Sequence, residues 1–172
     1  DEGFVMKDAF ESLLKDWCDA LVRLQISEYD QPSLKGGILC PHCARIHGRS
    51  GDAVHPLLSM AAATDEQIYL DAAIMLFEWS DYVSMPDGSW TGEIATCDWR
   101  GISVFGATAL AEALRFHGYL LPSATRVSWT NRLKAGAEYI YDMFSMDTGN
   151  INYPLGATYA LVLFSELLED SK

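Results

Sequence analysis

Apolar residues recur at helical spacing along most of the chain, and their pattern predicts six helices of two alternating kinds. Three have an apolar stripe beside a charged face, at 10–24, 64–83 and 123–144. The other three carry almost no charged side chains until their ends, at 52–63, 102–114 and 155–168. We call these three charge-poor helices dry. Strand signals are scarce. We therefore expect an all-α fold of helical hairpins, with the amphipathic helices outside and the dry helices inside.

Two local signals support the predicted helix starts. Pro56 lies in the first turn of the second helix, where a missing N–H costs least. Thr64 and Gln67 have the spacing of a capping box, which predicts the start of the third helix.

Three connections are longer than usual for a helical bundle, at about 28–51, 84–101 and 145–153. Each leads from an amphipathic helix into a dry one. If neighbouring helices are antiparallel, all three loops lie at the same end of the molecule. They also contain most of the side chains suited to chemistry, so we expect one composite functional face.

Charge and length restrict the partners. The 172 residues fit one domain, spanning 1–172, and the net charge of −12 repels nucleic acid and anionic membrane surfaces. No uninterrupted apolar stretch reaches the roughly 18 residues of a membrane span.

The stretch "CPHCARIHGRSGDAVHP" raises the question of a metal site. Cys40 and Cys43 have the spacing that lets two thiolates bind one zinc ion, and Cys97 or His47 could complete the set. A strong zinc signature would repeat the pair, and a thioredoxin-like role would need a βαβ context. We interpret the two as loop thiols and expect no metal and no cofactor.

Several segments resemble a known family. "GGILCPHCARIHGRSGDAVHPLL", "LFEWSDYVSMPDGSW", "GISVFGATALAEAL" and "GNINYP" are similar to the first part of α/α-toroid carbohydrate-active proteins of gut Bacteroidetes, near heparinase-like lyases and six-hairpin glucuronidases. This resemblance implies six hairpins, a sugar cleft at the N-terminal ends of the inner helices, and a periplasmic or secreted location. The chain supplies three hairpins, so we expect half of a toroid, which a homodimer through exposed inner helices could complete.

The start of the second helix is a possible binding site for a carboxylate. His47, Arg49 and Asp52 precede or begin it, close to unpaired N–H groups and the positive end of the helix dipole. Arg49 could bind the carboxylate of a uronic acid through two hydrogen bonds. The alternative is that Asp52 caps the helix while Arg49 pairs with a nearby acid.

The other long loops add aromatic and amide groups. Trp90 and Trp99 accompany Asp98 in the second loop, and Asn152 and Tyr153 end the third. Aromatic and amide side chains suit a sugar, so these four are predicted to bind substrate with His47 and Arg49. The alternative for Trp90 is a brace within the "PDGSW" turn, and Asn152 and Tyr153 could form a turn and helix cap.

The favoured function is glycoside hydrolysis of a uronate-containing glycan, with Asp52 and Asp98 as the catalytic carboxylates. The alternatives are a polysaccharide lyase, in which His47 or Tyr153 would be the base, and a saccharide-binding or assembly module without catalysis. His55 and His117 are given no role.

Overall fold

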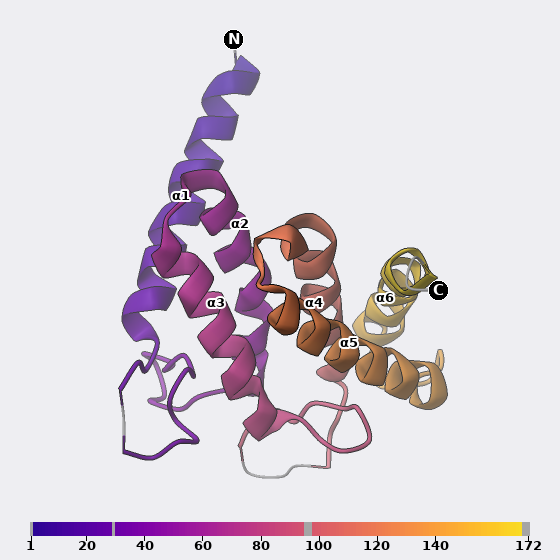
Figure 1. Ribbon diagram of the computed structural model, residues 1–172. Coiled ribbons are helices and arrows are strands. Elements are labelled where there is room, and N and C mark those ends of the chain that lie inside the picture. The colour runs from indigo at the N-terminus through magenta and orange to yellow at the C-terminus, as the bar shows by residue number, and fades with distance from the viewer. Residues whose placement is uncertain (1, 29, 95–97, 170–172) are drawn as a thin grey trace.

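The computed structural model describes residues 2–28, 30–94 and 98–169, and the described part of the chain is helical apart from loops and isolated β-bridges (Figure 1). The all-α prediction is confirmed. The helices are α1 (Glu2–Leu24), α2 (Val54–Thr64), α3 (Gln67–Trp79), α4 (Ser103–His117), α5 (Ser123–Met143) and α6 (Asn152–Glu169), with short 3-10 helices η1 (Gly48–Ala53), η2 (Ser80–Val83) and η3 (Gly118–Leu120).

Helices α2, α4 and α6 lie side by side and parallel, with α4 in contact with both of the others. Ser59 Oγ of α2 is 2.9 Å from His117 Nε2 of α4, and His55, one turn earlier, faces Glu112. Glu112 in turn accepts a hydrogen bond from Tyr159 of α6. Phe105 and Arg115 of α4 contact Tyr153 and Glu166 of α6 in the same order. Residue numbers therefore rise together along each pair, and the N-terminal ends of all three helices share one end of the molecule.

The amphipathic helices pack against this row. Phe77 of α3 stacks on Trp129 of α5 with ring centroids 4.6 Å apart, and both rings belong to the hydrophobic core. The expected division into outer amphipathic and inner charge-poor helices holds for α2 and α4. In α2 and in α4 up to Leu114, nearly every side chain is buried or half-buried.

Helix α6 departs from its prediction as a dry helix. Leu155, Tyr159 and Val162 are 61%, 48% and 50% exposed, whereas Ala160 and Leu163 are buried. One face of α6 packs on α4, while the face that carries Leu155 and Val162 meets solvent in the described part of the chain. A homodimer through this face stays a prediction.

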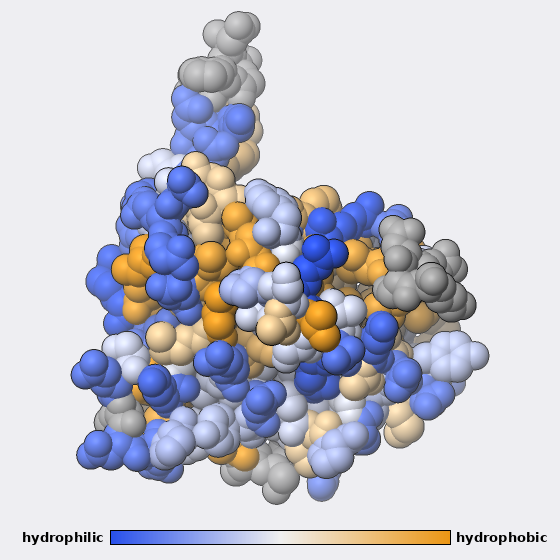
Figure 2. Space-filling view, viewed as in Figure 1, coloured by the Kyte–Doolittle hydropathy of each residue, from blue (hydrophilic) through white to orange (hydrophobic). Residues whose placement is uncertain are grey.

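Helix α1 is also longer and less covered than its pattern predicts. It begins at Glu2 rather than near Phe10, and its first half projects beyond the body of the molecule (Figures 1 and 2). The predicted stripe is split, because Leu14 and Leu21 pack against the core whereas Phe10 and Trp17 are 63% and 64% exposed.

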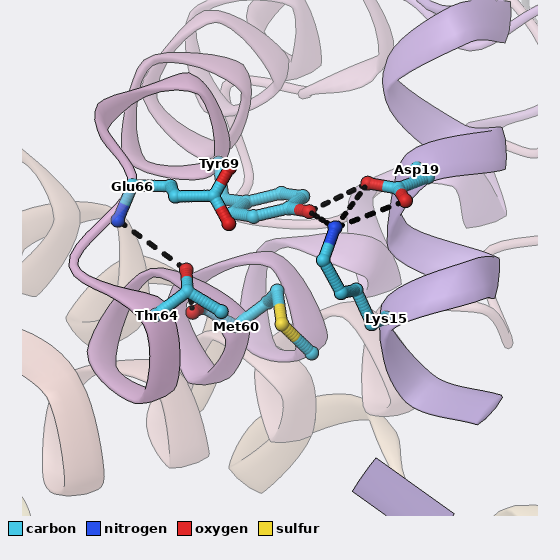
Figure 3. A network of polar contacts seen from close by, with 6 residues as sticks. All are labelled: Lys15, Asp19, Met60, Thr64, Glu66 and Tyr69. Carbon is cyan, nitrogen blue, oxygen red and sulfur yellow. Dashed lines mark hydrogen bonds and ion pairs between the residues drawn. The ribbon is translucent and has the colours of Figure 1, made fainter. Parts of the chain in front are cut away.

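A buried tyrosine fastens α1 to the α2–α3 hairpin (Figure 3). The Tyr69 hydroxyl donates to Asp19 over 2.5 Å and accepts from the Lys15 ammonium over 2.8 Å, and Lys15 also pairs with Asp19. The hydrogen bonds from Tyr69 and Lys15 lower the pKa of Asp19, and those to Tyr69 and Asp19 raise the pKa of Lys15. Both side chains therefore stay charged in this contact.

The predicted capping box at the start of α3 is absent. Thr64 is the last residue of α2, and its hydroxyl donates back to Met60 O and accepts from Glu66 N (Figure 3). Asp65 follows in the left-handed conformation with φ 59°, which turns the chain so that α3 begins at Gln67. The Thr-x-x-Gln spacing thus ends one helix instead of capping the next.

The "PDGSW" turn is a brace between layers. Gly88 has φ 90°, and a Cβ there would collide with Ala135 O of α5. Trp90 is 6% exposed and lies under the Arg132 guanidinium, 3.5 Å from the ring centroid. Arg132 also donates to Ser84 Oγ, Gly88 O and Ser89 O. Trp90 therefore packs within the brace, and its predicted contact with substrate stays a prediction.

Replacing this arginine should destabilise the fold. Arg132→Met leaves two backbone carbonyls without their donor and removes the cation from the indole, so we expect a loss of about 2 kcal/mol in the free energy of unfolding. Chemical denaturation measures it. Arg126→Met is the matched control, since Arg126 lies exposed on the same helix. Equal stability of the two variants would contradict the brace.

Two histidines pack between α2 and α4. His55 and His117 stack with ring centroids 5.6 Å apart, and each Nδ1 is buried without a hydrogen-bond partner in the described part of the chain. Burial lowers the pKa of both imidazoles below the ordinary 6.5, while Glu112 opposes this at His55. A proton added at either Nδ1 would create a buried N–H without an acceptor.

These lowered pKa values make stability depend on pH. In the unfolded chain each imidazole regains a pKa near 6.5, so below that pH the unfolded chain binds more protons than the folded one. The free energy of unfolding should therefore fall as the pH drops from about 7.5 to 5.5, by at most about 1.4 kcal/mol per unit for each histidine. His117→Gln should flatten this dependence in denaturant titrations. His42→Gln, at an exposed histidine, should leave it unchanged, and equal slopes in all three proteins would refute the assignment.

Candidate functional site

The three long loops meet at the N-terminal end of the parallel helices, as the sequence predicts. The first and second loops join through Gly48 N, which donates to Gly92 O over 2.8 Å, and through a β-bridge between His47 and Glu93. The third loop reaches the second at Gly149, which packs against the Trp99 ring. A composite face from distant segments is therefore present.

Arg49 and Asp52 form an ion pair on η1, at the entrance to α2. Asp52 makes no side-chain cap on α2, whose first residue follows Ala53. Of the two parts of the alternative interpretation, the local ion pair is confirmed and the helix cap is wrong. Burial raises the pKa of Asp52, and the nearby Arg49 guanidinium opposes that shift.

A continuous row of side chains leads from this ion pair across the rim. The Arg49 guanidinium carbon is 4.3 Å from the centroid of the Phe105 ring, which lies 5.6 Å from the Tyr153 ring. Tyr153 meets Trp99 edge to face at 5.0 Å, and Trp99 Nε1 donates to the Tyr153 hydroxyl over 3.4 Å. We name Arg49, Phe105, Tyr153 and Trp99 the aromatic wall.

Glycines make the outer half of the wall possible. Gly149 has φ 66°, and a Cβ there would lie 2.8 Å from the Trp99 ring and 2.9 Å from the Tyr153 ring. A Cβ at Gly101 would collide with the same indole. Trp99 is held between these backbones yet is 46% exposed, so one part of its surface faces solvent.

A hollow continues from the wall along the inner helices and is lined by Arg49, Asp52, His55, Phe105, Thr108, Ala109 and Glu112. Beyond it, Glu112 accepts from the Tyr159 hydroxyl over 2.5 Å and faces His55 Nε2 at 3.7 Å. The hydrogen bond to Glu112 raises the pKa of Tyr159, which keeps the phenol protonated. The exposed side of the inner helices is therefore polar at this level.

Sequence reasoning missed Phe105, Glu112 and Tyr159. All three belong to helices interpreted as dry. A single charged residue in an apolar run, such as Glu112, did not indicate on which face of the helix its side chain lies. One signal was available, because Phe105, Thr108, Ala109 and Glu112 have the i, i+3, i+4, i+7 spacing of one helical face of α4.

Three predicted site residues lie on the same rim without joining the aromatic wall. Asn152 is the exposed first residue of α6, next to Tyr153. Asp98 is exposed beside Trp99, so its pairing with Asp52 as a second catalytic carboxylate stays a prediction. His47 contacts Cys43, with Nε2 3.1 Å from Cys43 Sγ, and its predicted contact with substrate stays a prediction.

The side chains around His47 form a separate cluster. The ligand atoms of Cys40, Cys43 and His47 all lie within 4.8 Å of one another. The backbone N–H groups of Cys43 and His42 hydrogen-bond to the Cys40 sulfur and lower the pKa of its thiol. Cys97, considered with this cluster from the sequence, lies outside the described residues.

The aromatic wall has the chemistry of a site for a cyclic, acidic ligand. The Arg49 guanidinium can donate two parallel hydrogen bonds to a carboxylate. The N-terminus of α6, at Asn152 and Tyr153, adds the positive end of a helix dipole. Exposed aromatic surface on Trp99 can pack against the apolar face of a ring. None of the described helices is long and apolar enough to cross a membrane.

Comparisons with known proteins identify the family of the chain. Residues 14–172 match the family model of the ulvan lyase N-terminal domain. The chain is 39% identical over 169 residues to a protein of Formosa agariphila named broad-specificity ulvan lyase, with 98% of this chain and 26% of that protein aligned. The chain thus spans about a quarter of the length of this relative. No solved structure matches the chain. The match over most of its length shows that the chain belongs to the ulvan lyase N-terminal domain family.

Proposed function

We propose that this chain is the glycan-binding part of a polysaccharide lyase that acts on a uronate-containing glycan. The observation that carries the proposal is the aromatic wall, in which an arginine, a phenyl ring, a phenol and an indole share one rim. The family assignment favours a lyase over the glycoside hydrolase expected from the sequence. The lyase was the alternative interpretation there.

The reaction explains why these groups are suited to it. In β-elimination a base removes the proton on C5, next to the uronate carboxylate, while the C4–O bond breaks and the leaving oxygen takes up a proton. The products are a C4–C5 double bond on one fragment and a hydroxyl on the other. Loss of the C5 proton builds negative charge on the carboxylate, so a cation placed against it lowers the barrier. Arg49 is the cation of the aromatic wall.

Tyr153 is the proposed proton-transfer group. Its hydroxyl already accepts a hydrogen bond from Trp99 Nε1, and that bond would strengthen if the phenol lost its proton to become the base. Of the two bases considered for a lyase, His47 is turned to Cys43 and away from this role. Tyr153 remains on the aromatic wall, beside the arginine that would hold the carboxylate.

The ion pair between Arg49 and Asp52 suits binding better than hydrolysis. A hydrolase would need Asp52 free to act as nucleophile or base, with a second carboxylate about 5 to 9.5 Å away. Here the carboxylate is engaged by Arg49 and partly covered. An arriving uronate would compete with Asp52 for the guanidinium.

Binding of acidic oligosaccharides tests the proposal. In a Trp17→Phe background, which removes an exposed indole of α1, uronate oligosaccharides should change the fluorescence of the chain through Trp99. Arg49→Ala should weaken their binding by about 10-fold or more, because a charge-assisted hydrogen bond is lost. Neutral oligosaccharides of the same length should bind far more weakly.

Arg126→Ala is the matched control, since Arg126 is exposed on α5. Equal losses in Arg49→Ala and Arg126→Ala would indicate general charge attraction and contradict a built site. The products identify the reaction, because elimination creates an ultraviolet-absorbing double bond and hydrolysis does not. Cleavage without that absorbance would reject the lyase.

A further inference from the structure

The cluster of Cys40, Cys43 and His47 lies on the first loop, outside the aromatic wall, and the proposed function gives it no role. We propose that these three side chains bind a zinc ion. The site would be structural and would hold the segment that leads into η1. The inference is independent of the glycan-binding proposal.

The backbone of the loop brings the two cysteines to one side. Cys40 N donates to Arg45 O over 2.8 Å and Ala44 N donates to Cys40 O over 2.9 Å, so the chain reverses within six residues. An antiparallel bridge between Leu39 and Ile46 continues the pair of strands below the turn. Two thiols separated by two residues at the tip of such a hairpin can reach one ion.

Ala44 marks the turn as unusual. Its φ of 53° is in the left-handed region, which is costly for a residue with a Cβ. This conformation reverses the chain directly after Cys43 and lets Ala44 N bond back to Cys40 O. The backbone N–H groups of His42 and Cys43 also point at the Cys40 sulfur. The loop therefore places two hydrogen-bond donors at the sulfur, which would stabilise a metal-bound thiolate.

The third ligand comes from the residue that begins the next element. His47 is the N-cap of η1, and its Nε2 is 3.1 Å from Cys43 Sγ. All ligand atoms of the set lie within 4.8 Å of one another. In a tetrahedral zinc site with Zn–S near 2.3 Å and Zn–N near 2.0 Å, ligand atoms are about 3.5 to 3.8 Å apart. Small side-chain rotations are enough to reach that geometry.

The ligand types select the metal. Two thiolates with one imidazole favour zinc over magnesium or calcium, which prefer oxygen ligands. Binding displaces the thiol protons to solvent, and the fourth position is left to a ligand outside this set. The exposure of Cys43 gives the ion access from solvent.

The position of the cluster indicates what the ion would do. His47 lies two residues before Arg49 and forms a β-bridge with Glu93 of the second loop. A metal at His47 would fix the hairpin tip to the start of η1, and hence the place where the Arg49–Asp52 pair begins. Glu93 also forms an ion pair with Arg45, with Arg45 Nη1 3.4 Å from Glu93 Oε1, and this contact links the hairpin to the same loop.

Metal content of the chain tests the site directly. Reduced, metal-free protein is given one equivalent of zinc, desalted and analysed by inductively coupled plasma mass spectrometry. We expect about one zinc per chain. Replacement by cobalt should give the near-ultraviolet absorption of a thiolate–cobalt bond. Little retained zinc together with no cobalt band, in the folded unaltered chain, would overturn the proposal without any variant.

Matched variants assign the ligands. Cys43→Ser should abolish the cobalt–thiolate band or reduce it by half, and His47→Ala should weaken zinc affinity by about 100-fold. His42→Ala and Cys18→Ala should bind zinc as the unaltered chain does, since His42 lies outside the ligand set and Cys18 is buried against Pro56 O. Circular dichroism checks that each variant is folded.

Two results of this series would reject the site. One is equal zinc affinity in His42→Ala and His47→Ala, which would show that His47 contributes no more than a histidine outside the ligand set. The other is a disulfide between Cys40 and Cys43 that persists in the presence of zinc and reductant, which would make the pair a redox element.

Discussion

The parallel packing of α2, α4 and α6 is the constraint on which the rest of the structure depends. Because all three helices run in one direction, their N-terminal ends coincide, and the loop that enters each of them must arrive at the same rim. Arg49, Trp99 and Tyr153 come from three such loops and are far apart in the chain, yet they form one row with Phe105 of α4. Charge-poor helix faces permit this packing, since they let neighbouring backbones approach closely. The best example is Gly156 of α6, where a Cβ would just touch the Val104 side chain of α4.

The sequence predicted this arrangement at the level of elements because its signals there are strong. Long periodic runs define five of the six helices to within a few residues, and the alternation of charged and uncharged helices identifies the layers for α2 and α4. Arg49 and Asp52 were recognised because they stand where a loop enters a helix. Their partners were predictable only in part. Trp99 and Tyr153 could be placed on the rim, but their edge-to-face contact depends on Gly101 and Gly149, whose effect is visible only in three dimensions.

Where the structure differs from the expectations, the reasons are physical. The "PDGSW" turn allowed two interpretations of Trp90, and the brace is the one with visible contacts, because Arg132, 42 positions further along the chain, covers the Trp90 ring. His47 was grouped with Arg49 by proximity in sequence, whereas in the structure its imidazole contacts Cys43, next to the left-handed turn at Ala44. The charge-poor pattern of α6 predicts burial. Such a pattern shows that a helix can be buried, but it does not show whether another element of the protein packs on it. The apolar faces of α6 and of the first half of α1 are both exposed in the described part of the chain.

The composite rim requires that the second and third loops meet at the N-terminal end of α6. Nuclear Overhauser effects from the Trp99 indole in the 172-residue chain test this contact most directly. With ring centroids 5.0 Å apart, we expect cross-peaks between the Trp99 and Tyr153 rings, and an upfield shift of the Gly149 α-protons lying against the indole. An indole that shows cross-peaks only to its neighbours in sequence, with Gly149 at ordinary chemical shifts, would contradict the composite rim.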